Sequence, residues 1–285
     1  MVRLKLDFVE GKMIKPMQGF KKIYPLNGYK ISKTLRFSKY ISFKRLKENV
    51  DKKNIVFVSP KLWEDPFEQI YYRADFEKYN YQQPNIFCMC LTENATQNEA
   101  AAWKMYQDGT EKMIQVRLWA EKMLQQLDRF CQSNHFSVYI GKMNYGFLQK
   151  EIESLYKEHG QIHEDYFPKN FCNEHYLKLL LLKRRSFEFE NEVRIFVIPD
   201  NNKSDDSEKL WCEFPFDYNN GTIYSVKAAP LQPFPIGDPR HENYEKIQEV
   251  EAAVYKEALK KILPTLDSTK IRQSHLYEPE KIIKL

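Results

Sequence analysis

Three acidic side chains alternate with other residues in the stretch Ser186 to Ile198, and their spacing could support acid–base chemistry. The stretch is rich in aromatic and β-branched residues and ends at Pro199, so its composition predicts one strand. On a strand, Glu188, Glu190 and Glu192 would share one face, because side chains alternate with a period of two. Neighbouring carboxylates repel each other, which raises the proton affinity of at least one of them. The spacing therefore indicates either a site that needs a cation or ligand, or a solvated outer face.

Two basic side chains accompany these glutamates. Arg194 would lie on the same strand face and act as a partial counter-ion, which is the purely structural interpretation of the pattern. Lys183 belongs to a basic run at the end of a helix predicted over 173–185, directly before the strand. We therefore include Lys183 and Arg194 as residues that bind or orient a substrate.

The elements that would position these residues follow from hydrophobic periodicity. Strands are expected over 34–37, 54–58, 85–91, 112–118, 136–140, 210–216, 222–228 and 271–277, and helices over 41–50, 98–107, 119–131, 145–158, 173–185 and 243–263. Strands and helices interleave without regular alternation, which favours a single α+β domain over 1–285, with a mixed or antiparallel central sheet and flanking helices. We divide it into a basic amino-terminal segment (1–33), a sheet-forming core (34–118 and 186–277) and a mainly helical insertion (119–185).

Composition excludes several classes of protein. Hydrophobic residues make up 42% of the chain and aromatic residues 14%, which is enough for a packed core. The chain has only 9 glycines and no glycine-rich phosphate-binding motif. No apolar run approaches the roughly 20 residues of a membrane span, and the amino terminus lacks the apolar centre of a secretory signal. Five irregularly spaced cysteines indicate reduced thiols, so we expect a cytoplasmic protein without membrane association.

Positive charge is concentrated near the amino terminus. Residues 1–50 carry 13 Lys and Arg side chains against three acidic ones, whereas the whole chain has a net charge of +5. A basic segment on an acidic body attracts phosphate, either in nucleic acid or in a small phosphorylated ligand. Ordinary solubilising lysines are the alternative explanation.

Four short motifs keep their order along the chain. They are Phe57 to Glu68 (FVSPKLWEDPFE), Cys88 to Glu93 (CMCLTE), Trp103 to Tyr106 (WKMY) and the late Lys183 followed by Phe187 to Arg194 (FEFENEVR). Together they resemble the bacterial domain-of-unknown-function family 2971, over about residues 34–277. The chain departs from that family's pattern at Glu64, Phe187 and Phe189, where Asn, Trp and Tyr are usual. The Glu-x-Glu-x-Arg core is kept.

A weaker resemblance, to mono-ADP-ribosyltransferases, implies a role for each residue. That family places an Arg on an early strand, a Ser at the end of a following strand and Glu-x-Glu on a late strand. The resemblance implies that Arg36 contacts the phosphates of NAD, Ser59 holds the nicotinamide ribose, Glu192 is the catalytic carboxylate and Glu190 orients or activates the acceptor. A fixed carboxylate would favour the positive charge that builds on the ribose as nicotinamide leaves. The implied protein is an NAD-dependent ADP-ribosyltransferase-like enzyme of the toxin or anti-phage effector type, with nucleic acid or protein as acceptor.

Further aromatic and acidic side chains complete this predicted site. Stacking on nicotinamide or adenine is predicted for four aromatic residues, with burial in the core as the alternative for each: Trp63, Phe67, Trp103 and Tyr106. Asp65 and Glu68 follow Ser59 closely and would line the same pocket.

Two other functions stay open on the sequence. Carboxylates beside a lysine would suit a metal-dependent nuclease, and the residues of that kind are Asp65, Glu68, Glu190, Glu192 and Lys183. A non-enzymatic nucleic-acid-binding module, with the basic segment as its contact surface, is the other. A metal-like spacing also occurs at His159, His163, Cys172 and His175, but a surface loop explains it equally well, and we assign no metal ligand. The acceptor and the oligomeric state do not follow from the sequence.

Overall fold

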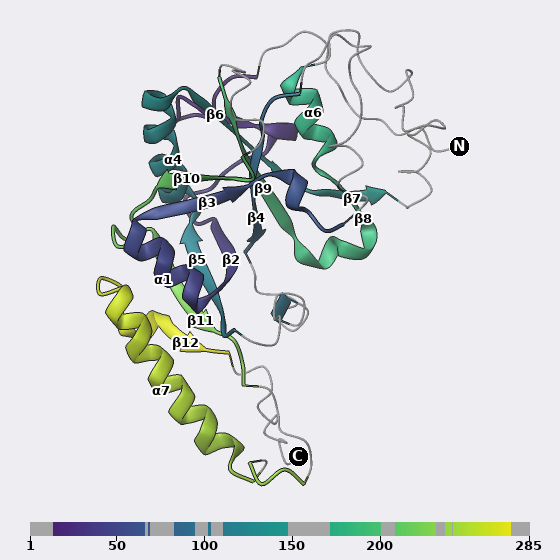
Figure 1. Cartoon of the computed structure of the whole chain (residues 1–285). Helices are drawn as coiled ribbons and strands as arrows, with labels where there is room; N and C mark the ends of the chain where they lie inside the picture. Colours follow the sequence, from purple (N-terminus) through teal and green to yellow (C-terminus); the bar gives the residue numbers. More distant parts are fainter. Residues whose placement is uncertain are drawn as a thin grey trace. The chain divides into compact units, whose positions relative to one another are not determined.

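A computed structural model of the chain describes residues 14–65, 68, 83–94, 102–103, 111–147, 172–200, 209–231, 237–240 and 242–274. Its contacts fall into two compact units, each assembled from three separate segments of the chain. Unit 1 comprises Met1–Ser32, Ile55–Thr92 and Leu124–Phe214, and unit 2 comprises Lys33–Asn54, Glu93–Met123 and Pro215–Leu285. Strands and helices alternate irregularly, and both parallel and antiparallel pairs occur (Figure 1). The predicted α+β class with a mixed sheet is therefore confirmed.

The sheet of unit 1 is built around its strand β9. Its strands are β1 (Ile23–Pro25), β3 (Asn54–Val58), β4 (Phe87–Glu93), β6 (Phe136–Lys142), β9 (Glu192–Pro199) and β10 (Trp211–Pro215), in the order β1-β6-β9-β4-β3-β10. β1 pairs parallel with β6, whereas β9 pairs antiparallel with both β6 and β4. Because β9 has a partner on each side and is buried from Glu192 to Ile198, its two charged residues are buried as well.

Helices and a small second sheet surround β9 in unit 1. They are α4 (Ala120–Asn134, of which Leu124 onward belongs to this unit), α6 (Asn173–Leu179), and the parallel pair β7 (Asn144–Phe147) and β8 (Leu182–Arg184), with 3-10 turns η1 (Leu26–Gly28), η2 (Pro60–Leu62) and η5 (Arg185–Glu190). The apolar stripe of α4, including Leu124, Leu127 and Cys131, is completely buried. The short β7–β8 pair matters most for the site, because β8 carries Lys183.

Two predicted elements next to the glutamates are wrong. The residues before Asn191 do not belong to the strand; they form η5, and β9 begins only at Glu192. Asn191 interrupts the strand because its backbone is left-handed (φ 44°), a conformation that Asn tolerates better than most residues. The helix predicted over 173–185 ends at Leu179, and Lys183 lies on a strand instead of a helix end.

The segment 119–185, predicted to be a mainly helical insertion, contains three strands among its described residues. β6 lies beside β9 within the sheet, and β7 and β8 form the small second sheet. The helix predicted over 145–158 begins inside β7, and the rest of it lies outside the described residues. Most of the helix predicted over 98–107 lies outside them too.

Asp128 on α4 holds the backbone that leads into β1. Its buried carboxylate accepts hydrogen bonds from the backbone N–H groups of Lys21 (3.0 Å) and Lys22 (2.6 Å) and from the side chain of Gln132 (2.8 Å). Hydrogen bonds to a charged group contribute about 1.5–3 kcal/mol each. We expect Asp128→Asn to lower the free energy of unfolding by about 2 kcal/mol in urea denaturation. Asp51→Asn, at an exposed surface pair, is the control, and an equal loss in both variants would contradict this prediction.

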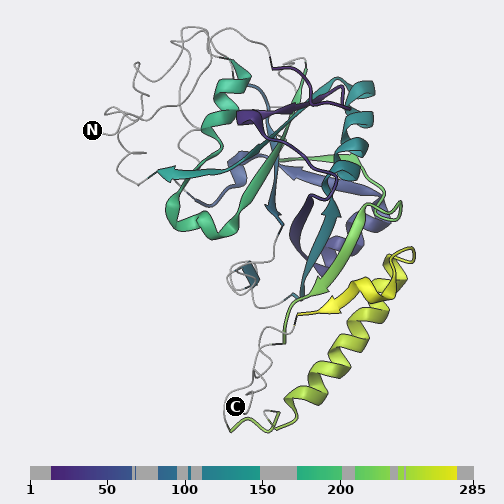
Figure 2. The same cartoon turned by 180° about the vertical axis from the view of Figure 1, so that it is seen from behind.

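The described residues of unit 2 form strands and helices. Its strands are β2 (Arg36–Ser42), β5 (Met113–Trp119), β11 (Ile223–Ala228) and β12 (Ile271–Gln273), in that order, and its helical elements are α1 (Phe43–Lys52), α7 (Tyr244–Ile262) and the 3-10 turn η7 (Ser268–Lys270). β2, β5 and β11 are antiparallel neighbours, whereas β12 runs parallel to β11. Ile114, Val116 and Leu118 alternate along β5 and are all buried, which places one face of this sheet in the core. α7 packs along β12 (Figure 2).

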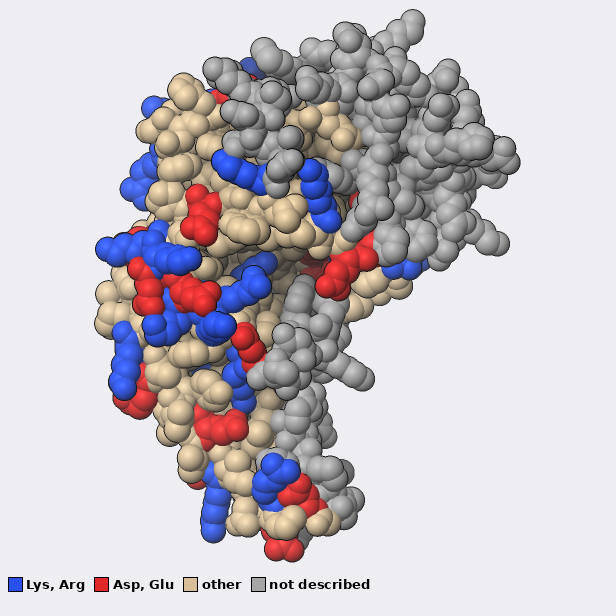
Figure 3. Space-filling model, in the orientation of Figure 1, with Lys and Arg blue, Asp and Glu red and all other residues tan. Residues whose placement is uncertain are grey.

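Charge on the surface of α1 is mixed. Lysine and arginine side chains lie beside acidic ones on the face shown in Figure 3, and Lys47 pairs with Asp51 one turn further along the helix (2.5 Å). This part of the basic stretch 1–50 therefore carries acidic partners on the face in view. Across the described ranges, every helix is too short or too polar to cross a lipid bilayer.

Candidate functional site

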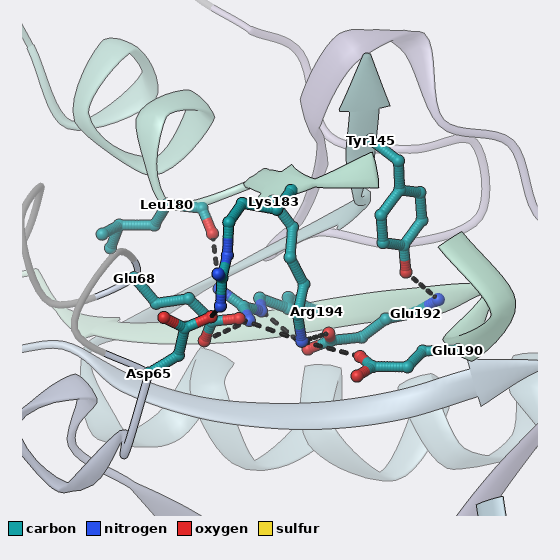
Figure 4. A network of polar contacts seen from close by, with 9 residues as sticks. Asp65, Glu68, Tyr145, Leu180, Lys183, Glu190, Glu192 and Arg194 are labelled. Carbon is teal, nitrogen blue, oxygen red and sulfur yellow. Dashed lines mark hydrogen bonds and ion pairs between the residues drawn. The ribbon is translucent and has the colours of Figure 1, made fainter. Parts of the chain in front are cut away.

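Lys183 connects three glutamates inside unit 1 (Figure 4). Its ammonium nitrogen lies 2.6 Å from Oε2 of Glu190, 2.9 Å from Oε2 of Glu192 and 2.9 Å from Oε1 of Glu68. All four side chains are buried. Glu190 ends η5 and Glu192 begins β9, so the left-handed Asn191 between them turns both carboxylates toward one ammonium. The fold therefore gathers these glutamates by a turn, where the sequence pattern predicted a continuous strand.

Arg194 donates hydrogen bonds to two of the three glutamates that contact Lys183. Its Nε donates to Oε1 of Glu192 (2.7 Å), its Nη2 to Oε2 of Glu68 (2.8 Å) and its Nη1 to the carbonyl oxygen of Leu180 (2.7 Å). The guanidinium also lies 4.1 Å from the ring centre of Trp63. Arg194 is only 1% exposed. Each of its three guanidinium nitrogens thus donates to a protein partner. Trp63, predicted to stack on a ligand, stacks on Arg194.

Two further contacts extend the network. Arg184 pairs with Asp65 at 3.0 Å between Nη2 and Oδ2. The hydroxyl of Tyr145 accepts a hydrogen bond from the backbone N–H of Glu192 (2.7 Å). Tyr145 was missed by sequence reasoning because the pattern around it indicated a helix, and only the β7–β8 pairing brings it to the start of β9. Glu188 does not join the network; it is exposed on η5 and faces Arg185.

The core of this network has more negative than positive groups: Glu68, Glu190 and Glu192 face Lys183 and Arg194. Burial raises the pKa of the Glu190 carboxyl to about 7, and the charge of Glu192 adds to that effect against the opposing charge of Lys183. Burial acts on Glu192 in the same direction, but the charges of Arg194 and Lys183 outweigh it and hold the pKa of Glu192 well below its usual range. Of these two carboxyls, Glu190 is therefore the one whose pKa lies near neutral pH.

The raised pKa of Glu190 makes the stability of the folded chain depend on pH. The pKa of Glu190 is higher in the folded chain than in the unfolded chain, so the folded state binds more protons between about pH 4.5 and 7. Stability must fall as pH rises through that window, by on the order of 3 kcal/mol from this group. Glu190→Gln mimics the protonated side chain, so we expect the variant to lack this loss and to be more stable than the wild type at pH 8 but not at pH 5.

Urea denaturation of both proteins at pH 5 and pH 8 measures the difference. Glu188→Gln is the matched control, because Glu188 lies on the same turn but is exposed. It should keep the pH dependence of the wild type. If Glu190→Gln and the wild type lose stability in parallel between the two pH values, the assignment of the titrating group is wrong.

Ser59 and Arg36 lie in different units. Ser59 directly follows the last residue of β3, is buried, and accepts a hydrogen bond from the backbone N–H of Lys61 (3.3 Å), which caps η2. Arg36 belongs to unit 2, where its guanidinium lies 3.7 Å from the ring centre of Tyr224 and 4.8 Å from that of Trp119. Each of the two side chains therefore has a local structural role.

The other predicted aromatic residues do not join the network within the described ranges. Trp103 is completely buried in unit 2, with its ring edge-on to Tyr40 at a centroid distance of 5.1 Å. It therefore belongs to the core, which was the alternative to stacking on a ligand. Phe67 and Tyr106 lie outside the described residues.

The candidate metal ligands are only partly described. His159 and His163 lie outside the described residues, whereas Cys172 and His175 sit at the start of α6 with 3.4 Å between Sγ and Nδ1. In the part of the chain that the structure describes, no group of three or more His, Cys, Asp and Glu side chains is arranged to hold a metal ion.

Comparison with known proteins adds no relative: no protein-family model, no curated protein and no solved structure matches this chain. The resemblances seen in the motifs therefore remain predictions.

Proposed function

We propose that this chain is an NAD-dependent ADP-ribosyltransferase-like enzyme in which Glu190 is the carboxylate that acts on the substrate. The observation that carries the proposal is the buried Glu-x-Glu pair on Lys183, in a cluster whose carboxylates outnumber its cations. Structural ion-pair networks usually balance their charges, because an uncompensated buried charge is costly. An excess carboxylate in such a place is typical of a group that takes part in chemistry.

The chemistry of ADP-ribosyl transfer suits such a group. As nicotinamide leaves, positive charge develops on the ribose, and the charge of ionised Glu190, which shares Lys183 with two other carboxylates, would favour it. The same carboxylate would accept the proton of the attacking acceptor group. Glu192 is a poorer candidate for both tasks, because its two oxygens are held by Arg194 and Lys183. We therefore give Glu190 the role that the resemblance assigned to Glu192, and make Glu192 a positioning residue.

The turn η5 supplies further groups that suit a dinucleotide. Phe189 is 37% exposed beside Glu190, and an exposed aromatic ring suits stacking on nicotinamide or adenine. Arg185 is also exposed on this turn, and a guanidinium binds phosphate through paired hydrogen bonds. We expect these two unit 1 side chains to contact NAD. They take the place of Arg36 and Trp103, which lie in unit 2.

Incubation of the full chain with NAD tests the proposal. We expect release of nicotinamide, detected by chromatography, and transfer of labelled ADP-ribose to nucleic acid or to protein when the two acceptors are offered separately. Absence of nicotinamide release, together with absence of any shift in the melting temperature at millimolar NAD, would refute the proposal.

A metal-dependent nuclease is the alternative that the sequence left open, and three carboxylates do converge on one cationic position, but no such group among the described residues is arranged to hold a metal ion. Lys183 occupies that position, so a divalent ion would have to displace its ammonium. A rise in melting temperature with Mn²⁺, accompanied by cleavage of nucleic acid without NAD, would favour the nuclease over the transferase.

A further inference from the structure

The 19-residue helix α7 packs one of its faces against unit 2 and exposes the other. On the packed face, Leu259 is completely buried and the ring of Tyr255 lies 6.1 Å from that of Phe43 between their centroids. β12 runs along this helix in Figure 2. On the outer face, Val250 is 64% exposed and Val254 is 61% exposed, the two highest values among the large hydrophobic side chains that the structure describes. Two valines one helical turn apart thus form an exposed apolar patch.

The outer face of α7 has the residue spacing of a helix–helix seam. Seam positions alternate in steps of four and three residues, which keeps them on one side of the helix. Four exposed residues of α7 follow this spacing: Lys246, Val250, Ala253 and Glu257. One flank of the seam carries two apolar residues and the other flank two exposed charged ones: Ile247 and Val254, then Glu249 and Lys256. The seam therefore has an apolar centre with charges at fixed positions around it.

We propose that α7 binds α7 of a second copy of this chain, as an antiparallel helix pair related by a two-fold axis. In such a pair, the seam and each flank of one helix meet the same positions of the other in reverse order. Val250 then lies against Ala253 of the second copy, and Val254 lies against Ile247 of the second copy. Each contact occurs twice because of the symmetry, so apolar side chains fill the centre of the interface.

The charges on the outer face of α7 identify a second copy as the partner. In the antiparallel pair, Glu249 lies opposite Lys256 of the second copy, and Lys246 lies opposite Glu257 of the second copy. A parallel pair in register would instead place Lys246 against Lys246 and Glu257 against Glu257, and like charges in contact oppose association. A surface that matches its own reverse in both charge and apolar positions is self-complementary, as a two-fold interface requires.

The interface is small and separate from the Lys183 network. One pair of short helices belongs to the class of small interfaces, which form weak or transient complexes, so we expect a Kd of micromolar order. All of the residues that form the proposed pair belong to unit 2, whereas Lys183 and its glutamates belong to unit 1. Dimerisation therefore goes beyond the proposed transferase function.

Sedimentation velocity of the full chain, at concentrations from about 5 to 500 µM, tests the proposal. We expect the wild type to pass from monomer to dimer over this range. Glu249→Lys and Lys256→Glu should each raise the Kd about tenfold or more, because each substitution places like charges opposite each other twice. An equal mixture of the two variants should regain the wild-type affinity, since each variant then supplies the charge that complements the other.

Glu48→Lys is the matched control, because it makes the same change of charge at an exposed position of α1 and should leave the Kd unchanged. The three substituted residues are all exposed, so the melting temperatures should equal that of the wild type. The proposal is overturned if the wild type stays monomeric over the whole range, or if Glu249→Lys and Lys256→Glu dimerise as well as the wild type. Failure of the mixture to dimerise would also overturn it.

Discussion

Arg194→Met should lower the free energy of unfolding by about 3–5 kcal/mol, which is the largest stability change we expect from a single substitution in this chain. Arg194 is buried, and its guanidinium is bonded to Glu192, Glu68 and the carbonyl of Leu180. Methionine fills much of the same space but leaves both carboxylates facing Lys183 alone. The cost is the desolvation of acidic groups that have lost a partner, and urea denaturation at pH 7 measures it.

Arg185→Met is the matched control, because Arg185 is exposed and its contact with Glu188 is long (3.8 Å). Its effect should stay within about 0.5 kcal/mol. A double-mutant cycle adds a sharper test: Arg194→Met combined with Glu192→Gln should cost less than the sum of the single variants, because the second change removes one of the stranded charges. If Arg194→Met unfolds at the same urea concentration as Arg185→Met, the network does not stabilise the fold in the way that its geometry indicates.

Glu190→Gln should lower NAD turnover by about 10²–10⁴-fold, the range associated with loss of a positioned acid or base. The wild-type rate should rise with pH through about 7, because Glu190 must be ionised to favour positive charge on the ribose and its pKa lies there. In the variant this rising limb should disappear. Nicotinamide release, measured from pH 5.5 to 8.5, gives both results.

Two comparisons separate chemistry from folding in that experiment. Glu188→Gln, on the same turn but exposed, should retain turnover and the wild-type pH profile. The melting temperature of Glu190→Gln should equal or exceed that of the wild type at pH 8, since the substitution removes a carboxylate that burial disfavours. A folded Glu190→Gln variant with undiminished turnover would exclude Glu190 from the reaction.

Much of the fold was predictable from local pattern. Apolar alternation and β-branched runs predicted β3 and β11 almost to the residue, and helical spacing predicted α7. The local sequence of each of these elements favours the secondary structure that it adopts, so tertiary contacts did not change it. The prediction was wrong where one residue altered the backbone: the pattern from Phe187 to Glu190 suits a strand, but the left-handed Asn191 separates it from β9. An Asn flanked by acidic residues was the available signal for that turn.

The sequence by itself determined which residue types the site would use: two glutamates two positions apart, a following arginine and a preceding lysine, in a chain of α+β class. Only the tertiary structure decided which of them meet. Glu68 and Tyr145 reach the network through sheet and turn contacts between distant segments, and Arg36 lies in the other unit. The roles of Glu190 and Glu192 differ for the same reason. Glu190 ends η5 and Glu192 begins the central strand β9, so both carboxylates are buried, but Glu192 contacts two cations and Glu190 contacts one. Such a difference in surroundings cannot be encoded in spacing along the chain.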